Sequence, residues 1–250
     1  MSISFGGRGE QRLPMQVMVV IPTYNECENM EKIAEAVLSQ PVDVHVAIVD
    51  DNSPDGTGEI ADALSVRNER VHVIHRQGKM GLGSAYITGF KYALQQGAQY
   101  VFEMDADFSH DPAYIPSLLE AARATDVVVG SRYVSGGGTE NWGLVRQLIS
   151  RGGSLYARVI LGMPIWDLTG GFNCWRRDVL EAVDLDAVTS NGYAFQIEMK
   201  YRAFRRGFRL VEVPIVFVDR RVGESKMSGS IVREALWKVW RFRLDSRIGK

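Results

Sequence analysis

Cysteine is scarce in this sequence, and the two that it contains, Cys27 and Cys174, stand far apart. Neither belongs to a C-x-x-C pair, and the four histidines form no pair at the spacing of a metal-binding motif. These absences exclude a disulfide framework and argue against a structural zinc site. They are typical of a protein kept in a reducing compartment, so we expect a cytoplasmic location.

Long apolar runs and excess charge are also missing. No stretch reaches the roughly 18 to 20 apolar residues of a membrane span, and the polar start MSISFGGRGEQR predicts a flexible segment over residues 1–14, without a signal peptide. Lys plus Arg number 29 and Asp plus Glu 30. Overall charge therefore predicts neither nucleic-acid nor membrane binding, and any basic site must be local.

What the sequence does contain is a regular alternation of short β-branched or aromatic runs with segments of helical spacing. Asp111 and Pro112 open one such segment as a helix cap and first-turn proline. The pattern predicts an α/β fold with a mainly parallel sheet, helices on both faces and a ligand crevice at the carboxyl ends of the strands. The expected strands are 17–21, 44–49, 71–74, 100–104 and 127–129, and the expected helices are 29–38, 58–64, 81–96 and 112–124.

The alternation ends near residue 134. We expect a glycine-rich loop at 135–138, helices at 145–161 and 193–206, the loop DLTGGFN between them, and a strand at 210–213. This predicts one domain over residues 15–230 with an elaborated second half. The last segment, 231–250, reads as an amphipathic helix that either packs on the domain or lies at a membrane interface. Its apolar residues are Ile231, Leu236, Trp237, Val239, Trp240 and Phe242.

Two carboxylates, Asp105 and Asp107, follow the fourth expected strand in EMDADFSHDP. Side chains two positions apart on an extended segment point the same way, so both carboxylates converge on one point. Mg²⁺ and Mn²⁺ take such oxygen ligands and are often shared with a substrate phosphate. In dehalogenase-like phosphatases the first Asp is a nucleophile, but that motif lies near the chain start and carries Thr where Ser109 stands here. A metal held against a nucleoside diphosphate-sugar is therefore favoured.

Polar and basic residues at other strand ends fall near the same crevice. PTYNE follows the first strand and Asp50-Asp51 the second, and each is either a helix-capping turn or part of a nucleoside pocket. GKMGLGSAYITG is neither a P-loop nor a complete dinucleotide-binding turn. Basic groups near the crevice indicate a second anionic ligand, because the guanidinium group of arginine can donate two parallel hydrogen bonds to a phosphate. They are Arg132, Arg146 (four residues before Ser150), Arg220, Arg221 and Lys226.

The motifs IPTYNE, VDDNSPDGT, KMGLGSA, MDADFSH, GSRY, DLTGGF and GESKMSG, in this order, resemble the family-2 glycosyltransferases with a GT-A (Rossmann-like) fold. More narrowly, the chain is similar to the dolichol- and polyprenol-phosphate mannosyltransferases. The likeness covers about residues 15 to 230. ENWGLVRQLISRGG together with GESKMSG indicates a polyprenyl-phosphate acceptor, bound by the elaborated second half.

This resemblance implies inverting transfer of mannose from GDP-mannose to a polyprenyl monophosphate with Mg²⁺ or Mn²⁺. It implies a guanosine site at Pro22, Tyr24, Glu26, Val49 and Asp51, and a metal and diphosphate site at Asp105, Ala106 and Asp107, with Ser109 where some relatives carry a Gln metal ligand. For the acceptor phosphate or donor diphosphate it implies Arg132, Arg146, Ser150, Arg220 and Lys226, and near the donor Gly192. UDP-glucose as donor, or a non-catalytic nucleotide-sugar-binding protein, are the alternatives.

Two further expectations concern chemistry and location. The second pKa of a phosphomonoester is about 6, so the attacking oxygen is anionic at neutral pH and needs no protein base. The histidines are therefore expected to be structural. A polyprenyl acceptor places the protein at the cytoplasmic face of a membrane as a peripheral protein, which reaches lipid through its own surface or through an integral membrane partner.

Overall fold

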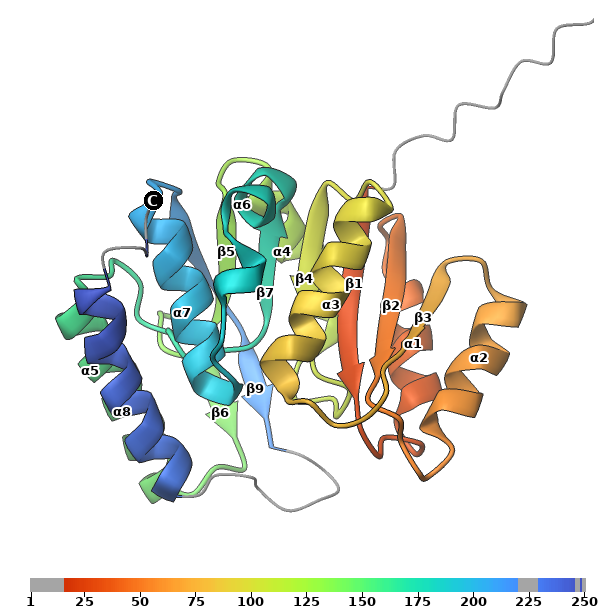
Figure 1. The fold of residues 1–250 in the computed structure, drawn as a ribbon, viewed down its shortest axis with the longest axis horizontal. Coiled ribbons are helices and arrows are strands. Elements are labelled where there is room, and N and C mark those ends of the chain that lie inside the picture. The colour runs from red at the N-terminus through yellow and green to blue at the C-terminus, as the bar shows by residue number, and fades with distance from the viewer. Residues whose placement is uncertain (1–15, 220–228, 246–247, 249–250) are drawn as a thin grey trace, which may run out of the picture.

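The β-branched runs of the sequence form one seven-stranded sheet in the computed structural model, which describes residues 16–219, 229–245 and 248 (Figure 1). The strand order is β3-β2-β1-β4-β7-β5-β8. Every neighbouring pair is parallel except those of β7, which is antiparallel to β4 and β5. The predicted mainly parallel sheet is confirmed. The strands are β1 (Val17–Thr23), β2 (Val44–Asp50), β3 (Val71–His75), β4 (Tyr100–Glu103), β5 (Val127–Ser131), β7 (Asn173–Arg176) and β8 (Leu210–Pro214).

Strand β7 is the main departure from the predicted elements. The prediction of a loop through DLTGGFN was wrong at its last residue, because Asn173 begins β7 and pairs with Glu103 and Val129. A four-residue strand, NCWR, is too short to show a period-two pattern, and its ends are polar. A second, two-stranded sheet joins β6 (Gly138–Glu140) to β9 (Val216–Val218) and was not predicted either.

Helices cover both faces of the sheet, as predicted. On one face a buried cluster joins the sheet to α1 (Met30–Leu38), α2 (Thr57–Arg67) and α4 (Ile115–Ala122), which follows the 3₁₀ turn η1 (Pro112–Tyr114). The side chain of Asp111 accepts a hydrogen bond from the backbone N–H of Ala113, which confirms it as a cap. The other face carries α3 (Leu82–Gln95), α5 (Leu144–Leu161), α6 (Arg177–Ala182), the 3₁₀ turn η2 (Leu185–Ala187), α7 (Gly192–Arg205) and α8 (Gly229–Leu244).

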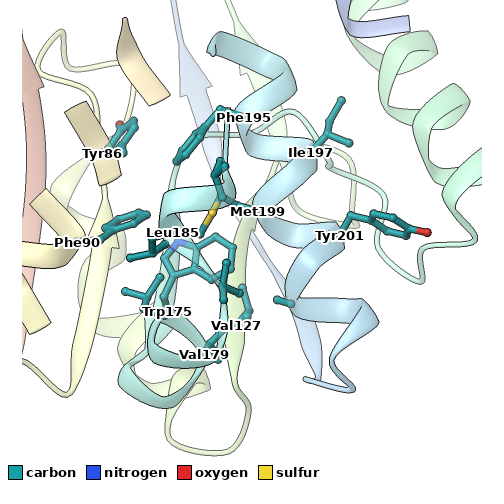
Figure 2. Close-up of a cluster of buried hydrophobic side chains, with 14 of the residues drawn as sticks. Tyr86, Phe90, Val127, Trp175, Val179, Leu185, Phe195, Ile197, Met199 and Tyr201 are labelled. Atoms are coloured by element: carbon teal, nitrogen blue, oxygen red, sulfur yellow. The ribbon is translucent and has the colours of Figure 1, made fainter. Parts of the chain in front are cut away.

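The core on this second face is rich in aromatic side chains. Figure 2 shows Tyr86 and Phe90 of α3 approaching Phe195 of α7, with Trp175 of β7 in the same cluster. The rings of Tyr86 and Phe195 stack with centroids 5.8 Å apart. These contacts join the first half of the chain to the elaborated second half within one buried cluster.

Helix α3 lies unusually close to β1, and a glycine permits it. A Cβ added to Gly89 would come within 2.2 Å of Val20 Cγ1. We expect Gly89→Ala to lower the free energy of unfolding by up to about 2 kcal/mol, because the helix-propensity gain of about 1 kcal/mol offsets only part of an overpacking cost of roughly 1–3 kcal/mol. Denaturant unfolding measures this. The control is Gly152→Ala in α5, where a Cβ meets nothing within 4 Å, and there we expect a gain of up to about 1 kcal/mol; equal effects of the two changes would contradict the close packing.

The last helix, α8, buries one face against the domain and exposes the other. Val239 and Phe242 are buried against the domain, while Trp237 and Trp240 face outward with 73% and 48% of their surface exposed. One face of α8 therefore packs on the domain, and the membrane-interface alternative stays a prediction. The side chains of Ile231 and Leu236 lie outside the described residues. Among those residues, none of the helices has the length and apolar composition that a bilayer-spanning segment requires.

The topology fixes where a site can form. Strand β1 lies between β2 and β4, so the chain leaves β1 in one direction through β2 and β3 and returns to its other side at β4. Loops after β1 and β4 diverge at such a switch point and leave a crevice at the carboxyl edge of the sheet. PTYNE lies at the end of β1, Asp50-Asp51 at the end of β2, and Asp105-Ala106-Asp107 just after β4.

Candidate functional site

A cleft of about 460 Å³ opens at this edge of the sheet. Loops from both halves of the chain form it. The loops after β1 and β2 lie on one side of β4, and the loop after β5 lies on the other. The residues after β4 therefore lie in the middle of the cleft. The cleft brings together most of the predicted site residues: Pro22, Tyr24, Glu26, Asp51, Asp105, Ala106, Asp107, Ser109, Arg132, Arg146 and Gly192.

The two carboxylates sit in a tight turn after β4. Phe108 adopts a left-handed conformation with φ of 59°, which reverses the chain directly after Asp107. Asp107 Oδ1 then accepts hydrogen bonds from the backbone N–H (3.0 Å) and the hydroxyl of Ser109. Asp105 Oδ1 accepts one from the hydroxyl of Tyr86 at 2.9 Å. The turn thus orients both carboxylates with neutral donors.

These residues fit a divalent cation. The donor set consists of oxygens only, two carboxylates and a hydroxyl on one five-residue turn that lines the cleft, which suits Mg²⁺ or Mn²⁺ and not a soft metal. The described residues contain no cluster of three or more His, Cys, Asp or Glu that could hold a metal alone. A cation bound by Asp105 and Asp107 would therefore complete its coordination with water or with substrate oxygens, as Mg²⁺ commonly does.

His110 forms the wall beneath the carboxylates. Its Nδ1 accepts a hydrogen bond from the backbone N–H of Asp105 at 3.2 Å, and its ring stacks on Phe172 with centroids 5.1 Å apart. Burial lowers the pKa of His110, so the ring is neutral and keeps Nδ1 as an acceptor. This geometry agrees with the predicted structural role of the histidines. The sequence analysis did not predict that His110 lies in the cleft wall.

On the β2 side, Asp50 and Asp51 have different surroundings. Asp50 Oδ1 accepts hydrogen bonds from the hydroxyls of Thr23 (3.0 Å) and Ser53 (2.6 Å), so it joins the loops after β1 and β2. Asp51 Oδ1 lies 2.8 Å from Arg76 Nη1, in an orientation too bent for a hydrogen bond, and has no hydrogen-bond partner among the described residues. Burial raises the pKa of Asp51, against the opposing effect of Arg76.

Lys79 extends the same side of the cleft. Its ammonium group lies 4.0 Å from the ring centroid of Tyr24, a cation–π contact. The carboxylate of Asp51, which lines the cleft together with Tyr24 and Lys79, is suited to a ligand with N–H donors and a negative charge. A nucleoside diphosphate has both.

On the β5 side, Arg132 is buried and already paired. Its Nε and Nη2 donate to the two carboxylate oxygens of Asp167 at 2.8 and 2.7 Å, and Nη2 also donates to Thr169 at 2.9 Å. Burial alone would raise the pKa of Asp167, but Arg132 lowers it, and Asp167 stays ionised. Arg132 was predicted to bind phosphate. This prediction is corrected in one respect, because two edges of its guanidinium group already bind the side chains of Asp167 and Thr169.

Arg146 occupies the more open part of this side. Its guanidinium lies 4.1 Å from the ring centroid of Trp142 and its Nη1 contacts Asp219 Oδ2 at 2.7 Å. Trp142 meets Phe217 of β9 edge to face at 5.3 Å. An aromatic platform therefore holds an arginine that still lines the cleft.

A charged network supports the floor beneath both sides. Glu103 accepts hydrogen bonds from Trp175 Nε1 (2.7 Å) and Gln196 Nε2 (2.5 Å), while Lys200 donates to the carbonyl of Gly170 (2.6 Å). Burial raises the pKa of Glu103 to about 7 and lowers that of Lys200 to about 8. Because Gln196 and the 169–171 loop line the cleft, this network holds its floor in place.

Several predicted residues are not brought into the cleft. The side chain of Val49 is fully buried in the core and does not reach the cleft. It therefore cannot hold guanosine as predicted. Ser150 accepts a hydrogen bond from the hydroxyl of Tyr133 at 2.6 Å and does not line the cleft. Arg220, Arg221 and Lys226 lie outside the described residues.

Some cleft residues were missed by the sequence analysis. Lys79, His110 and Trp142 belong to motifs that the sequence analysis recognised, KMGLGSA, MDADFSH and ENWGLVRQLISRGG, and this membership could have marked them. Gln196 carried no such signal, because only the packing of the second half brings it to the cleft.

The parallel sheet with its switch-point cleft and central carboxylate pair defines a glycosyltransferase of the GT-A fold. The chain belongs to glycosyl transferase family 2, whose model matches residues 18–184. A solved structure of a mannosyltransferase from Pyrobaculum calidifontis, in complex with GDP-Man and Mn²⁺, shares the fold with a TM-score of 0.58 at 18% identity, over 91% of this chain and 60% of that chain.

Two relatives match along almost their whole length. The undecaprenyl-phosphate mannosyltransferase of Micrococcus luteus is 49% identical over 233 residues, which cover 93% of this chain and 96% of the relative. The polyprenol monophosphomannose synthase of Mycolicibacterium smegmatis is 46% identical over 250 residues, 98% of this chain and 94% of the relative. The family and the predicted fold class are confirmed.

Proposed function

We propose that this protein transfers mannose from GDP-mannose to the phosphate of a polyprenyl monophosphate, with inversion and with Mg²⁺ or Mn²⁺ at Asp105 and Asp107. The observation that carries the proposal is the layout of the cleft, in which the carboxylates lie between Asp51 and Tyr24 on one side and Arg146 on the other. The names of the two relatives support mannose and a polyprenyl phosphate, and the GDP-Man complex of the Pyrobaculum enzyme supports the donor.

The donor occupies the β1–β2 side in this proposal. The carboxylate of Asp51 accepts hydrogen bonds from N–H groups of the guanine, and Tyr24 with Pro22 forms an apolar wall against the nucleoside. Lys79 and the glycine turn before α3 face the diphosphate, where backbone N–H groups at a helix start favour an anion. Asp105 and Asp107 would hold a divalent cation, which would neutralise charge on the departing diphosphate.

The acceptor phosphate occupies the β5 side, against Arg146. One of its anionic oxygens forms the new bond to the anomeric carbon while the bond from that carbon to the diphosphate oxygen breaks, and the electron pair leaves with GDP. No proton moves in this step, in agreement with the neutral His110 as the only nearby imidazole of the described cleft. Attack opposite the leaving group inverts the configuration.

A donor-by-acceptor activity matrix tests the proposal. GDP-mannose and UDP-glucose, each labelled in the sugar, are offered with a detergent-solubilised polyprenyl phosphate and with the free alcohol as the acceptor control. We expect label in the organic phase only with GDP-mannose and the phosphate, and only with added Mg²⁺ or Mn²⁺. Preference for UDP-glucose, or transfer to the alcohol, would overturn the assignment of donor or acceptor.

Arg146→Ala tests the acceptor side separately. We expect the KM for the lipid phosphate to rise about 10-fold to 100-fold, because a charge-assisted contact of about 1.5–3 kcal/mol is lost, while the affinity for GDP measured by calorimetry stays within about twofold. Arg151→Ala, an exposed arginine further along α5, serves as the control. Equal loss of GDP and acceptor binding would place Arg146 on the donor instead.

We further propose that the protein works at the cytoplasmic face of a membrane, as a peripheral protein. The lipid substrates named for the relatives support membrane contact. Both cysteines are free in the structure, Cys174 in the core, which suits a reducing compartment. Fractionation of cells into membrane and supernatant before and after a high-salt wash tests this, and recovery only in the unwashed supernatant would contradict it.

A further inference from the structure

His110 uses one of its two ring nitrogens to hold the turn of the carboxylates. Its Nδ1 accepts a hydrogen bond from the backbone N–H of Asp105 at 3.2 Å. A backbone N–H can only donate, so Nδ1 carries no proton, and in the neutral ring the proton lies on Nε2. Nε2 makes no hydrogen bond with any residue in the part of the chain that the structure describes. His110 therefore keeps one N–H donor that these residues do not use.

This donor lies at the cleft. Phe172 stacks on the imidazole with ring centroids 5.1 Å apart, and Phe217 meets it edge to face at 5.4 Å. The residue is only 1% exposed, yet it lines the cleft together with Gly171. Its Cε1, the ring atom between the two nitrogens, would lie 3.5 Å from a Cβ built on Gly171. Because Asp105 covers the Nδ1 side, the Nε2 side faces the cleft, and a buried donor without a partner indicates a ligand.

The part of the cleft around this donor is polar but uncharged. We name it the neutral floor: His110, Thr169, Gly171 and Gln196, which all line the cleft. The amide of Gln196 is fixed, since it donates to Glu103 at 2.5 Å and accepts from Asn173 at 2.9 Å. The cations Lys79 and Arg146 stand at the two sides instead. An uncharged ligand rich in hydroxyl groups suits this floor better than a phosphate, which favours the cations.

We propose that His110 Nε2 donates a hydrogen bond to a hydroxyl oxygen of the transferred hexose, whose ring rests on the neutral floor. This inference rests on the proposed function, in which the hexose lies between the diphosphate on the Lys79 side and the acceptor phosphate on the Arg146 side. His110 then acts through both nitrogens. Nδ1 holds the backbone of Asp105, and Nε2 positions the sugar, so His110 is a specificity-determining residue that touches the donor.

Two substitutions separate the two nitrogens. His110→Asn removes the cleft donor but keeps an acceptor for Asp105, because Oδ1 of Asn, like Nδ1 of His, is bonded to Cγ. His110→Gln does the reverse, because its amide nitrogen lies two bonds beyond Cγ, as Nε2 does in His, and no acceptor is bonded to Cγ. Both variants lose the ring contacts with Phe172 and Phe217. The pair is therefore matched for packing and differs in which nitrogen is replaced.

Calorimetry with Mn²⁺ and without acceptor compares binding of GDP and of GDP-mannose, and the difference between them isolates the sugar. We expect His110→Asn to weaken GDP-mannose binding about threefold to tenfold, the effect of one lost neutral hydrogen bond, and to leave GDP binding within about twofold. In His110→Gln both affinities should change by the same factor, and the melting temperature should fall below that of the Asn variant because the N–H of Asp105 loses its acceptor. His75→Asn, a control at the exposed end of β3, should change neither affinity.

Donors that lack one hydroxyl group identify the contact. Analogues of GDP-mannose, each without one sugar hydroxyl, are titrated into the wild type and into His110→Asn. Removal of the hydroxyl that contacts Nε2 should weaken binding to the wild type about threefold to tenfold and binding to the variant less than about twofold, because both changes remove the same interaction. Losses that are equal in the two proteins for every analogue would overturn the proposal.

Equal weakening of GDP and GDP-mannose by His110→Asn would also overturn it, because His110 would then act only on the turn. Gly171→Ala tests the neutral floor if circular dichroism shows that neither His110 variant folds. Its Cβ would meet His110 and Gln196 at 3.5 and 3.6 Å, which are ordinary contacts, so the fold should remain. The methyl group should weaken GDP-mannose binding about tenfold by crowding the sugar and leave GDP unchanged. Unchanged GDP-mannose binding would contradict a sugar on this floor.

Failure of this inference is distinguishable from failure of the proposed function. A wild type that transfers no mannose in the donor-by-acceptor matrix would contradict the proposed function, while the binding measurements, which require no transfer, would still report on His110. If the matrix assigns UDP-glucose as the donor, UDP and UDP-glucose take the places of GDP and GDP-mannose in the same comparison. Active wild type together with unaltered GDP-mannose binding by His110→Asn would overturn the role of His110 alone.

Discussion

Replacing Asp107 with asparagine should lower mannosyl transfer by about a thousandfold while leaving the fold intact. The side chain is 7% exposed and lies in the cleft, and Asn keeps an oxygen for the hydrogen bonds from Ser109. What it loses is the negative charge that a divalent cation requires. Initial rates at saturating GDP-mannose and acceptor measure the loss, and calorimetry of Mn²⁺ with GDP measures the weakened metal affinity.

Asp111→Asn is the matched control for this prediction. Asp111 lies on the same loop, but its side chain caps η1 and Asn caps helices equally well, so activity should stay within about twofold. Transfer by Asp107→Asn at near wild-type rate with excess metal would contradict the metal role of the carboxylate pair. A fall in thermal stability of the Asp107 variant would instead show that the residue supports the turn.

Arg132→Met should be the most destabilising change near the cleft, at about 3–5 kcal/mol in the free energy of unfolding. The side chains of Arg132 and Asp167 are 4% and 0% exposed. Methionine would leave the carboxylate of Asp167 ionised and buried with no bidentate partner, and the backbone N–H groups of Arg132 and Gly170 are too few to replace the guanidinium. Denaturant unfolding monitored by tryptophan fluorescence measures this.

The second variant Arg132→Met/Asp167→Asn should recover at least half of the lost stability, because the uncompensated charge is gone and the Asn oxygen still accepts from one of the two backbone N–H groups. Glu31→Ala is the control. It breaks the exposed ion pair of Arg67 and Glu31, whose side chains are 60% and 46% exposed, and should cost less than about 1 kcal/mol. A loss from Arg132→Met as small as this would show that the buried pair adds little.

The sequence was informative wherever a feature depends on residues close together in the chain. Strand runs such as 44–49 and helices such as 81–96 were predicted nearly to their observed ends, because β-branched runs and helical spacing act locally. The placement of Asp105 and Asp107 at the sheet edge followed from the same reasoning, since residues after consecutive parallel strands meet at one edge. Strand β7 was missed because its four residues gain stability only from neighbours far along the chain.

Side-chain environments were less predictable than positions. Arg132 was placed near the crevice correctly, but its pairing with Asp167, 35 residues away, gave no local signal. Val49 lies within β2 and Asp51 directly after its last residue, yet Val49 is in the core and Asp51 lines the cleft. Residues two positions apart share a side only while the chain is extended, and only the packed fold determines that the chain turns into the cleft after β2.

By itself, the sequence determined an α/β chain with a carboxylate pair at the end of its fourth strand, because periodicity and residue type are properties of short segments. Tertiary structure alone decided that Trp142 and Gln196 from the second half line the cleft beside that pair, and that α5 and α8 turn apolar side chains outward. Contacts between distant segments depend on how layers pack, and a linear pattern of apolar residues does not distinguish a face covered by the domain from one left for another surface.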